Sequence, residues 1–332
     1  MSGVKCTNNS RKCLAVALVC VLAFSLVGCG SKKVDPNAYR IYESSQEYGI
    51  IERESANTEV LLAERLCIAD NTNIAVKKAD SDLAEAGGVF NEGTKKTVYA
   101  KDIYARKYPA STTKILTAYV ALKYGKLNDV YTVSENACDQ PYDSTMADLS
   151  PGDKISLKEL LHGMLMVSGN DAAIAIAEGV SGDVPSFVKL MNREAKRLGA
   201  THSHFINPNG LHHDDHYTCV YDMYLIFSAA IQKKPFLSIL KKPVYTANFK
   251  GADGNPKQVL WETTNGYLTG EYEVPEGITV IGGKTGTTGM AGSCLVLLSR
   301  NARKDPIISV VFHADYRSTL FQFMSELLKL AK

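Results

Sequence analysis

The chain has 332 residues, 45% of them hydrophobic and 22% charged, with 37 Lys and Arg residues against 35 Asp and Glu residues. This length and apolar content allow a substantial buried core, in one large domain or two smaller ones. The formal net charge is +2, and loss of the three cations among residues 1–28 would leave about −1. A charge this close to zero gives no support for binding nucleic acid, so no nucleic-acid partner is expected.

The N-terminus has the features of a secretory signal. Three basic residues precede an uninterrupted apolar stretch of 15 residues, 13–27, in which only Ser25 is polar. The stretch is shorter than the roughly 20 residues that cross a bilayer as a helix. It therefore predicts a signal peptide over residues 1–28, with an uncleaved membrane anchor as the alternative.

The tetrapeptide Leu26-Val27-Gly28-Cys29 resembles a bacterial lipobox, in which the signal is cut before a cysteine that then carries lipid. Cys29 is thus the predicted lipidation site. It would hold the protein outside the cytoplasm, anchored to the bacterial cell membrane. The polar residues 29–57 then predict a lipid-anchored linker, and residues 58–332 form the predicted catalytic domain.

Four cysteines lie beyond the predicted lipidation site. Their spacing matches neither a metal motif nor C-x-x-C, so we expect buried free thiols. One disulfide is also compatible with an extracytoplasmic protein. The four are Cys67, Cys138, Cys219 and Cys294.

The apolar pattern changes character twice within residues 58–332. A strand, turn and strand are predicted at 87–91 and 96–100, followed by a helix over 111–124 that ends at Gly125. Helices follow in the middle of the chain, and β-branched or apolar runs that read as antiparallel strands come before a last helix. The predicted middle helices are 157–167, 171–178 and 185–198; the later strands are 278–284, 293–299 and 307–313; the last helix is 318–331.

Strands at both ends of a helical middle predict an α/β lobe built from two parts of the chain, with an all-helical subdomain inserted at about residues 126–230. The functional site is then expected in the cleft between the two lobes.

Three short motifs carry the chemistry: Ser111-Thr-Thr-Lys114, Ser168-Gly-Asn170 and Lys284-Thr-Gly286. Each of the first two patterns also occurs three times elsewhere, whereas Lys-Thr-Gly occurs once. The copy at Ser111 differs in its setting, because it opens a predicted helix. Residues i and i+3 share a helix face, so Lys114 lies one turn above Ser111, and the free N–H groups of the helix start lie beside both. Together, the three motifs predict an activated serine, a proton relay and a group that binds an anion.

With these motifs the chain resembles the low-molecular-weight penicillin-binding proteins of the D-Ala-D-Ala carboxypeptidase family, from about Gly87 to the C-terminus. The flanking residues are more specific than the motif cores. They include Tyr108-Pro-Ala ahead of Ser111, Leu149-Ser-Pro-Gly152, Asp171-Ala-Ala173, Phe205-Ile-Asn-Pro-Asn-Gly-Leu211 and Tyr221-Asp222-Met223.

The resemblance implies a β-lactamase/DD-peptidase-like α/β fold, in which helices flank an antiparallel sheet. It also implies release of the terminal D-alanine from peptidoglycan pentapeptide stems through an acyl-enzyme on Ser111. β-Lactam antibiotics would be covalent inhibitors, and no cofactor is required.

The resemblance further assigns a role to each motif residue. Ser111 attacks the carbonyl, and Lys114, kept neutral by burial and cationic neighbours, accepts the serine proton. Ser168 and Lys284 pass a proton to the leaving amine, and Asn170 holds the amide of the acyl side chain. The carboxylate is bound by Lys284 with the hydroxyls of Thr285 and Thr287, Gly286 lets the strand lie close to a peptide, and the backbone N–H groups of Ser111 and Thr287 form the oxyanion hole.

The sequence departs from the family at one place. Some relatives carry an arginine shortly before Lys-Thr-Gly to help bind the carboxylate, but residues 261–268 contain none. Thr264 occupies that neighbourhood instead. Carboxylate affinity is the property that this departure affects.

Two other functions stay open. A class A β-lactamase needs a glutamate after Ser-Gly-Asn to activate the deacylating water, and no glutamate lies between Glu194 and Glu262. A catalytically idle lipoprotein could keep the cleft only to bind muropeptides. A zinc site on His212 and His216 would need a helical segment; because a loop is expected after Asn209-Gly210, no metal site is predicted.

Overall fold

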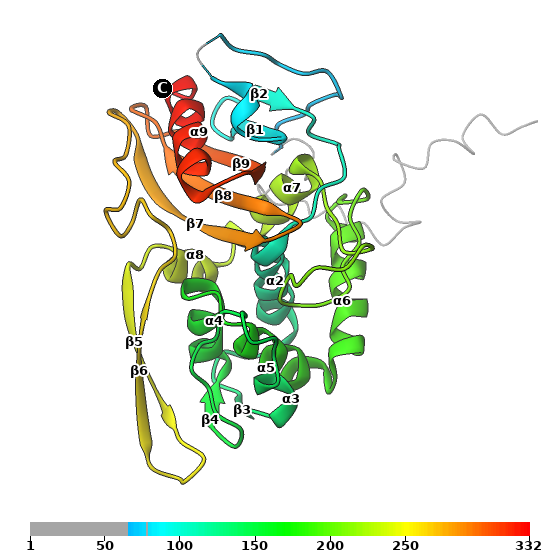
Figure 1. Ribbon diagram of the computed structural model, residues 1–332, viewed down its shortest axis with the longest axis vertical. Coiled ribbons are helices and arrows are strands. Elements are labelled where there is room, and N and C mark those ends of the chain that lie inside the picture. Colours follow the sequence, from blue (N-terminus) through cyan, green and yellow to red (C-terminus); the bar gives the residue numbers. More distant parts are fainter. Residues whose placement is uncertain (1–65, 78) are drawn as a thin grey trace, which may run out of the picture. The chain divides into compact units, whose positions relative to one another are not determined.

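The computed structural model describes residues 66–77 and 79–332 (Figure 1). The predicted signal peptide over 1–28, the lipidation site Cys29 and the linker 29–57 lie outside these residues. In the described part of the chain, no helix combines the length and the apolar character that crossing a membrane requires.

The described elements alternate from strands to helices and back to strands. The helices are the 3-10 turns η2 (Ser81–Leu83) and η3 (Ala110–Thr113), then α2 (Lys114–Tyr124), α3 (Glu135–Cys138), α4 (Leu157–Met166), α5 (Asn170–Ser181), α6 (Val184–Arg197), α7 (Val220–Ile231), α8 (Lys234–Leu240) and α9 (Arg317–Leu330). The strands are β1 (Ala86–Asn91), β2 (Lys96–Lys101), β3 (Val130–Thr132), β4 (Lys154–Ser156), β5 (Val244–Lys250), β6 (Pro256–Glu262), β7 (Thr279–Thr288), β8 (Gly292–Arg300) and β9 (Pro306–Ala314).

The main sheet has five strands in the order β2-β1-β9-β8-β7, all antiparallel to their neighbours. The side chains of strand β8 show why this sheet is buried on both faces. Along this strand Leu295 and Leu297 pack on one side with α9, whereas Val296 and Leu298 join the core on the other side. Because successive side chains of a strand point to opposite faces, a continuous apolar run needs cover on both. The sheet therefore lies between two helical layers.

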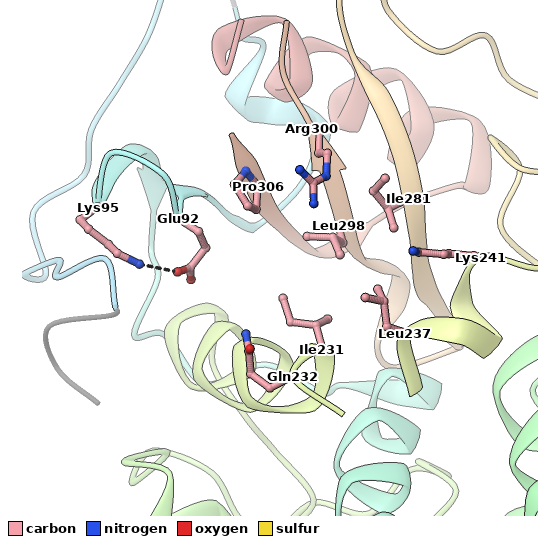
Figure 2. A pocket seen from close by; sticks show the side chains of 10 residues that line it. All are labelled: Glu92, Lys95, Ile231, Gln232, Leu237, Lys241, Ile281, Leu298, Arg300 and Pro306. Atoms are coloured by element: carbon pink, nitrogen blue, oxygen red, sulfur yellow. Dashed lines mark hydrogen bonds and ion pairs between the residues drawn. The ribbon is translucent and has the colours of Figure 1, made fainter. Parts of the chain in front are cut away.

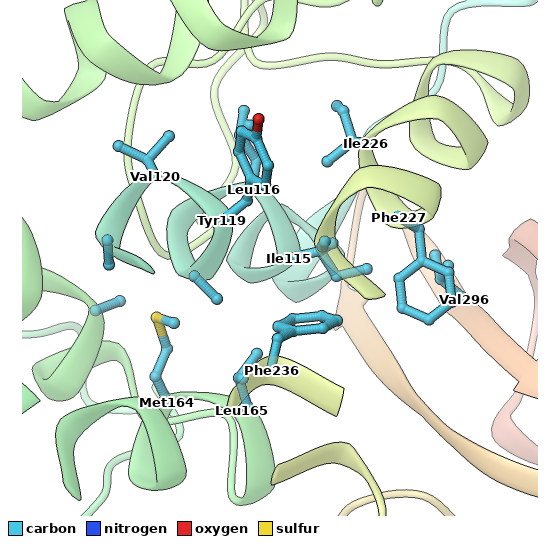
Figure 3. Packing of buried hydrophobic residues seen from close by; sticks show 14 of the residues in the cluster. Ile115, Leu116, Tyr119, Val120, Met164, Leu165, Ile226, Phe227, Phe236 and Val296 are labelled. Carbon is cyan, nitrogen blue, oxygen red and sulfur yellow. The ribbon is translucent and has the colours of Figure 1, made fainter. Parts of the chain in front are cut away.

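Helix α2 lies inside the helical layer on the face of the sheet opposite α9. Its side chains are buried from Lys114 to Ala121, on all sides of the helix, as expected for a helix that is apolar all round. Figure 3 shows Ile115 and Leu116 of α2 among side chains of α4, α7, α8 and β8. This packing fixes the first turn of α2, from which Lys114 projects.

The helical middle differs from the predicted all-helical subdomain in one respect. Strands β3 and β4 fall inside residues 126–230 and pair with each other, and β4 meets the β5–β6 hairpin to complete a sheet in the order β3-β4-β5-β6. Strands of three residues are too short to show an alternating pattern. The hairpin did leave a signal, because Asp253-Gly254 between alternating residues is a turn sequence.

Candidate active site

The serine of the first motif lies on a tight turn ahead of α2. Ser111 belongs to the 3-10 turn η3, and α2 begins at Lys114, so the predicted single helix is two elements that follow each other directly. Ala110, just before the serine, has a left-handed φ of 46°, which is unfavourable for alanine. Its carbonyl lies against Gly210, where a Cβ atom would come within 1.9 Å of it. The glycine thus makes room for the turn that presents Ser111.

Lys114 is fully buried and has three partners. Its Nζ lies 2.9 Å from Ser111 Oγ, 2.7 Å from Asn170 Oδ1 and 2.6 Å from the backbone oxygen of Asn209. Burial, and next the charge of Lys284, lowers the pKa of Lys114 well below its usual value. The buried amine is therefore poised to be neutral.

A neutral amine has two N–H donors and one lone pair. The oxygens of Asn170 and Asn209 can only accept, so they take the two N–H groups of Lys114. The lone pair is left for the hydroxyl of Ser111, which then donates to Nζ. This arrangement is that of a nucleophile beside its base.

The second motif turns sharply between α4 and α5. Ser168 has a left-handed φ of 68°, another conformation that costs roughly 1–3 kcal/mol and is typical of functional sites. Its hydroxyl accepts a hydrogen bond of 2.9 Å from the buried Lys284 Nζ, which also donates to the backbone oxygen of Thr285 at 2.8 Å. Burial lowers the pKa of Lys284 to about 7. This hydrogen bond thus joins the second motif to the third.

Asn170 opens α5 and is held by a loop packed over it. Its backbone N–H donates to the oxygen of Thr145 at 2.8 Å, and the next residue, Asp171, accepts from the backbone N–H groups of Ala147 and Leu149. Trp261 of β6 donates to the Ala147 oxygen at 3.1 Å. Burial raises the pKa of Asp171. This loop fixes the amide that contacts Lys114.

The third motif lies on β7, an edge strand of the main sheet, and among the described strands β7 pairs only with β8. Thr285 and Gly286 are buried, whereas the next residue, Thr287, is exposed. A Cβ atom on Gly286 would lie 2.9 Å from the backbone nitrogen of Ser111. The lack of a side chain therefore allows β7 to run directly beside the serine turn.

Thr285 has a hydroxyl partner on the segment where an arginine was missing from the sequence. Thr264 Oγ1 lies 2.5 Å from Thr285 Oγ1. Arg317 is the first residue of α9. Its guanidinium donates to the backbone oxygen of Thr264 at 3.0 Å and forms an ion pair with Glu271 at 2.6 Å. An arginine thus does reach this neighbourhood, from an element that comes after Lys-Thr-Gly in the chain.

The structure brings together all three motifs. Sequence reasoning missed the Asn209 oxygen, although the segment 205–211 was among the family-like stretches. It also missed Asp171, directly after a predicted site residue, and Arg317.

The segment 212–216 is a loop, as predicted. His216 is buried and its Nε2 lies 2.8 Å from Thr113 Oγ1, while its Nδ1 accepts from the N–H of Ile206 at 3.1 Å. Burial lowers the pKa of His216 to about 3. This histidine therefore ties the loop to η3 as a neutral ring.

A cavity of about 380 Å³ lies elsewhere, between α7, α8 and strands β7 to β9 (Figure 2). Apolar side chains such as Leu237 and Leu298 line it together with Lys241 and Arg300. None of its lining residues belongs to the three motifs, so it is separate from the candidate site.

Comparison with known proteins decides the family. The family model of D-alanyl-D-alanine carboxypeptidases, peptidase family S11, matches residues 73–316. The chain belongs to the D-alanyl-D-alanine carboxypeptidase family. The matched range contains every motif of the candidate site.

Individual members of the family support this. The chain is 35% identical to D-alanyl-D-alanine carboxypeptidase DacA of Haemophilus influenzae, over 67% of this chain and 54% of that protein. It is 34% identical to DacF of Bacillus subtilis, over 72% of this chain and 60% of that protein. The D-alanyl-D-alanine carboxypeptidase of Streptomyces sp. strain K15 is 32% identical over 69% of this chain and 81% of its own length. The chain thus spans only about half to three-fifths of the first two relatives.

Solved structures confirm the predicted fold class. The crystal structure of the Streptomyces K15 DD-transpeptidase superposes with a TM-score of 0.70 at 28% identity, covering 78% of this chain and 98% of that chain. The family fold, an antiparallel sheet flanked by helices, is therefore the fold of this protein.

Proposed function

We propose that this protein is a serine D-Ala-D-Ala carboxypeptidase that removes the terminal D-alanine from peptidoglycan pentapeptide stems. The observation that carries the proposal is the 2.9 Å approach of Ser111 Oγ to the buried Lys114 Nζ, whose other two partners can only accept. Membership of the carboxypeptidase family supports the choice of substrate.

Acylation uses the two buried lysines in turn. The oxygen of Ser111 bonds to the carbonyl carbon between the two D-alanines while its proton moves to Lys114. The bond to the leaving nitrogen then breaks, and D-alanine departs with a proton relayed through Ser168 from Lys284, 2.9 Å away. The proton held by Lys114 then replaces the one that Lys284 lost, so Lys114 is neutral again. Water attacks the ester and gives one proton to Lys114. This proton passes to Ser111 Oγ as the ester bond breaks, which releases the acid product and restores Ser111. The backbone N–H groups of Ser111 and Thr287 would stabilise the oxyanion.

The C-terminal carboxylate of the substrate binds at β7. Lys284 supplies a cation when protonated, and the hydroxyls of Thr285 and Thr287 supply hydrogen bonds. Arg317, paired with Glu271, holds the backbone oxygen of Thr264 beside the Thr264–Thr285 hydroxyl pair. Because β7 is an edge strand, an extended peptide can pair with its free side, which aligns the scissile bond with Ser111.

β-Lactam antibiotics would acylate the same serine, because they present a reactive carbonyl and a carboxylate to the same groups. Labelling with a fluorescent penicillin tests this. The full-length protein purified in detergent should label at Ser111, and Ser111→Ala should not label. Labelling of Ser111→Ala would overturn the assignment of the nucleophile.

Release of the acyl group to an amine instead of water is a second outcome of the same site. One similar solved structure is that of a DD-transpeptidase. We therefore propose that amine acceptors be tested beside water, with the ratio of cross-linked to hydrolysed product as the readout.

We also propose that Cys29 carries lipid and that the linker 29–57 tethers the domain 58–332 outside the cytoplasm. The tetrapeptide Leu26-Val27-Gly28-Cys29 after the apolar stretch supports this. Metabolic labelling with a tagged fatty acid should mark the wild-type protein and not Cys29→Ala. Equal labelling of both proteins would contradict lipidation at this cysteine.

A further inference from the structure

A cluster of three potential metal ligands lies at the N-terminal end of α7, outside the candidate active site. His202, Cys219 and Asp222 each offer one ligand atom, and these atoms all lie within 4.8 Å of one another. Cys219 is the N-cap residue of α7 and Asp222 lies in its first turn, whereas His202 comes from the segment after α6. The cluster thus joins two parts of the chain.

One carboxylate oxygen in this cluster lacks a hydrogen bond. Asp222 is only 1% exposed, and its Oδ2 accepts from the N–H of His202 at 2.7 Å and from the hydroxyl of Ser203 at 2.6 Å. Within residues 66–77 and 79–332 its Oδ1 has no hydrogen-bond partner, and the Nδ1 of His202 lies 3.8 Å away. A buried carboxylate oxygen without a donor is costly. A carboxylate oxygen of Asp222 lies within 4.8 Å of both other ligand atoms, so a cation between the three would compensate for the missing hydrogen bond.

The donor set defines the kind of cation. Thiolate and imidazole are ligands of zinc-class metals rather than of magnesium or calcium, and a carboxylate oxygen completes many such sites. The Cys219 sulfur accepts a long contact of 3.4 Å from the N–H of Asp222, and its thiol also interacts with the Asp222 carboxylate. His202 is 56% exposed, so an ion can enter from solvent past its ring. Water can fill a fourth position.

We propose that His202, Cys219 and Asp222 bind a thiophilic divalent cation of the zinc class. Binding forms a sulfur–metal bond and releases the thiol proton to solvent, so the oxidation state of the metal and of sulfur does not change. Burial raises the pKa of the Cys219 thiol, and the metal replaces the proton that the thiol otherwise keeps. The proposal does not depend on the carboxypeptidase activity.

The site would fasten a segment that supports the active site. This segment runs from Ser203 to Thr218. The hydroxyls of these two residues share a hydrogen bond of 2.8 Å, so its two ends already meet beside the cluster. Between them the segment carries His216, which contacts Thr113, and Asn209, whose oxygen contacts Lys114. A metal that joins His202 to α7 would therefore stabilise the position of the Lys114 acceptor.

No sequence motif marks this cluster, because a metal motif is recognised by regular spacing. Cys219 and Asp222 are three residues apart, but His202 lies in a different segment and reaches them only through the fold.

The test uses the full-length protein, freed of any affinity tag and stripped of metal with a chelator. Cobalt(II) is titrated as a spectroscopic probe and zinc as the metal to be retained. We expect one cobalt ion per chain with a thiolate-to-cobalt absorption band, zinc retention after gel filtration, and a higher melting temperature with zinc. Cys219→Ser keeps an oxygen acceptor for the helix cap but loses the thiolate, so it should lose the band and bind zinc at least about tenfold more weakly.

Two further variants complete the design. His202→Asn changes an exposed ring and should fold even if Cys219→Ser does not; it should also weaken zinc binding. Cys138→Ser removes a partly exposed free thiol elsewhere and should keep the band. Absence of stoichiometric cobalt or zinc in the wild type would overturn the proposal. So would an unchanged band and affinity in Cys219→Ser or unchanged zinc affinity in His202→Asn, because the cluster would then be a helix cap beside an ion pair.

Discussion

Lys114 Nζ lies 2.9 Å from Ser111 Oγ. Of the three contacts of this amine, the one with Ser111 is the only one in which the partner atom can donate a proton. The geometry therefore orders the proton transfer: the two acceptor oxygens fix the N–H groups, and the lone pair faces the nucleophile. Burial makes this neutral form accessible, since it lowers the pKa of Lys114.

Replacement of this base by arginine should slow acylation strongly. Lys114→Arg introduces a side chain that is always protonated and cannot accept the serine proton. We expect the rate of acylation by benzylpenicillin to fall by about 10²–10⁴-fold, as measured by stopped-flow or quenched labelling. A matched melting curve shows whether the variant is folded. Acylation at the wild-type rate would remove Lys114 from the role of base.

The pKa of Lys284 determines how kcat/KM should change at alkaline pH. Burial lowers the pKa of Lys284 to about 7, so this group loses its proton as pH rises through that value in the free enzyme. Both proposed roles of Lys284 need the proton. We therefore expect kcat/KM for a carboxylate substrate to fall as pH rises above about 7, and to fall on the acid side as Lys114 becomes protonated.

The control for this profile is Lys284→Arg. Its guanidinium stays charged at all working pH values, so the alkaline fall should disappear even if the activity is lower overall. An alkaline fall that persists unchanged in Lys284→Arg would assign it to another group.

Gly210 offers a test of how the serine turn is held. A Cβ atom there would lie 1.9 Å from the Ala110 oxygen, whereas Gly182, which also has a positive φ, has no atom within 4 Å of such a Cβ. Both Gly→Ala changes strain the backbone, but only Gly210→Ala adds a clash. We expect Gly210→Ala to lower the free energy of unfolding by about 1–3 kcal/mol more than Gly182→Ala does.

Acylation should separate the two glycine variants further. Gly210→Ala displaces Ser111, so its penicillin acylation should slow, while Gly182→Ala should acylate at the wild-type rate. Equal stability and equal acylation of both variants would show that the contact with Ala110 does not position the serine.

The pair of threonines at the carboxylate site should affect binding more than chemistry. Thr264 Oγ1 lies 2.5 Å from Thr285 Oγ1 and orients that hydroxyl. Thr264→Val keeps the shape and removes the hydrogen bond, so KM should rise about two- to tenfold with little change in kcat. Thr264→Ser should restore KM. A loss confined to kcat would place Thr264 in the chemical step instead.

The sequence predicted the elements that have a strong local pattern. The strand pairs at both ends, the helix after Ser111 and the helices on either side of Ser168 all lie within a few residues of their predicted bounds. The three motifs were predictable for the same reason, because each is short and the spacing within it has a chemical meaning.

What the sequence could not reveal arises from contacts between distant segments. The Asn209 oxygen reaches Lys114 only because Gly210 packs on Ala110, and Arg317 approaches Thr264 only because α9 covers the sheet. A backbone oxygen leaves no residue signature, and an arginine on a terminal helix shows no link to a strand that precedes it. The hairpin β5–β6 was predictable from Asp253-Gly254, but its pairing with β4 was not.

The most direct test of the proposed function is the release of free D-alanine from a pentapeptide that ends in D-Ala-D-Ala. The full-length protein purified in detergent is compared with Ser111→Ala at equal concentration, with melting curves as a check on folding. We predict D-alanine release by the wild type and none by Ser111→Ala. Equal release by both proteins, or no release by a wild-type protein that still binds penicillin covalently, would contradict the proposed carboxypeptidase.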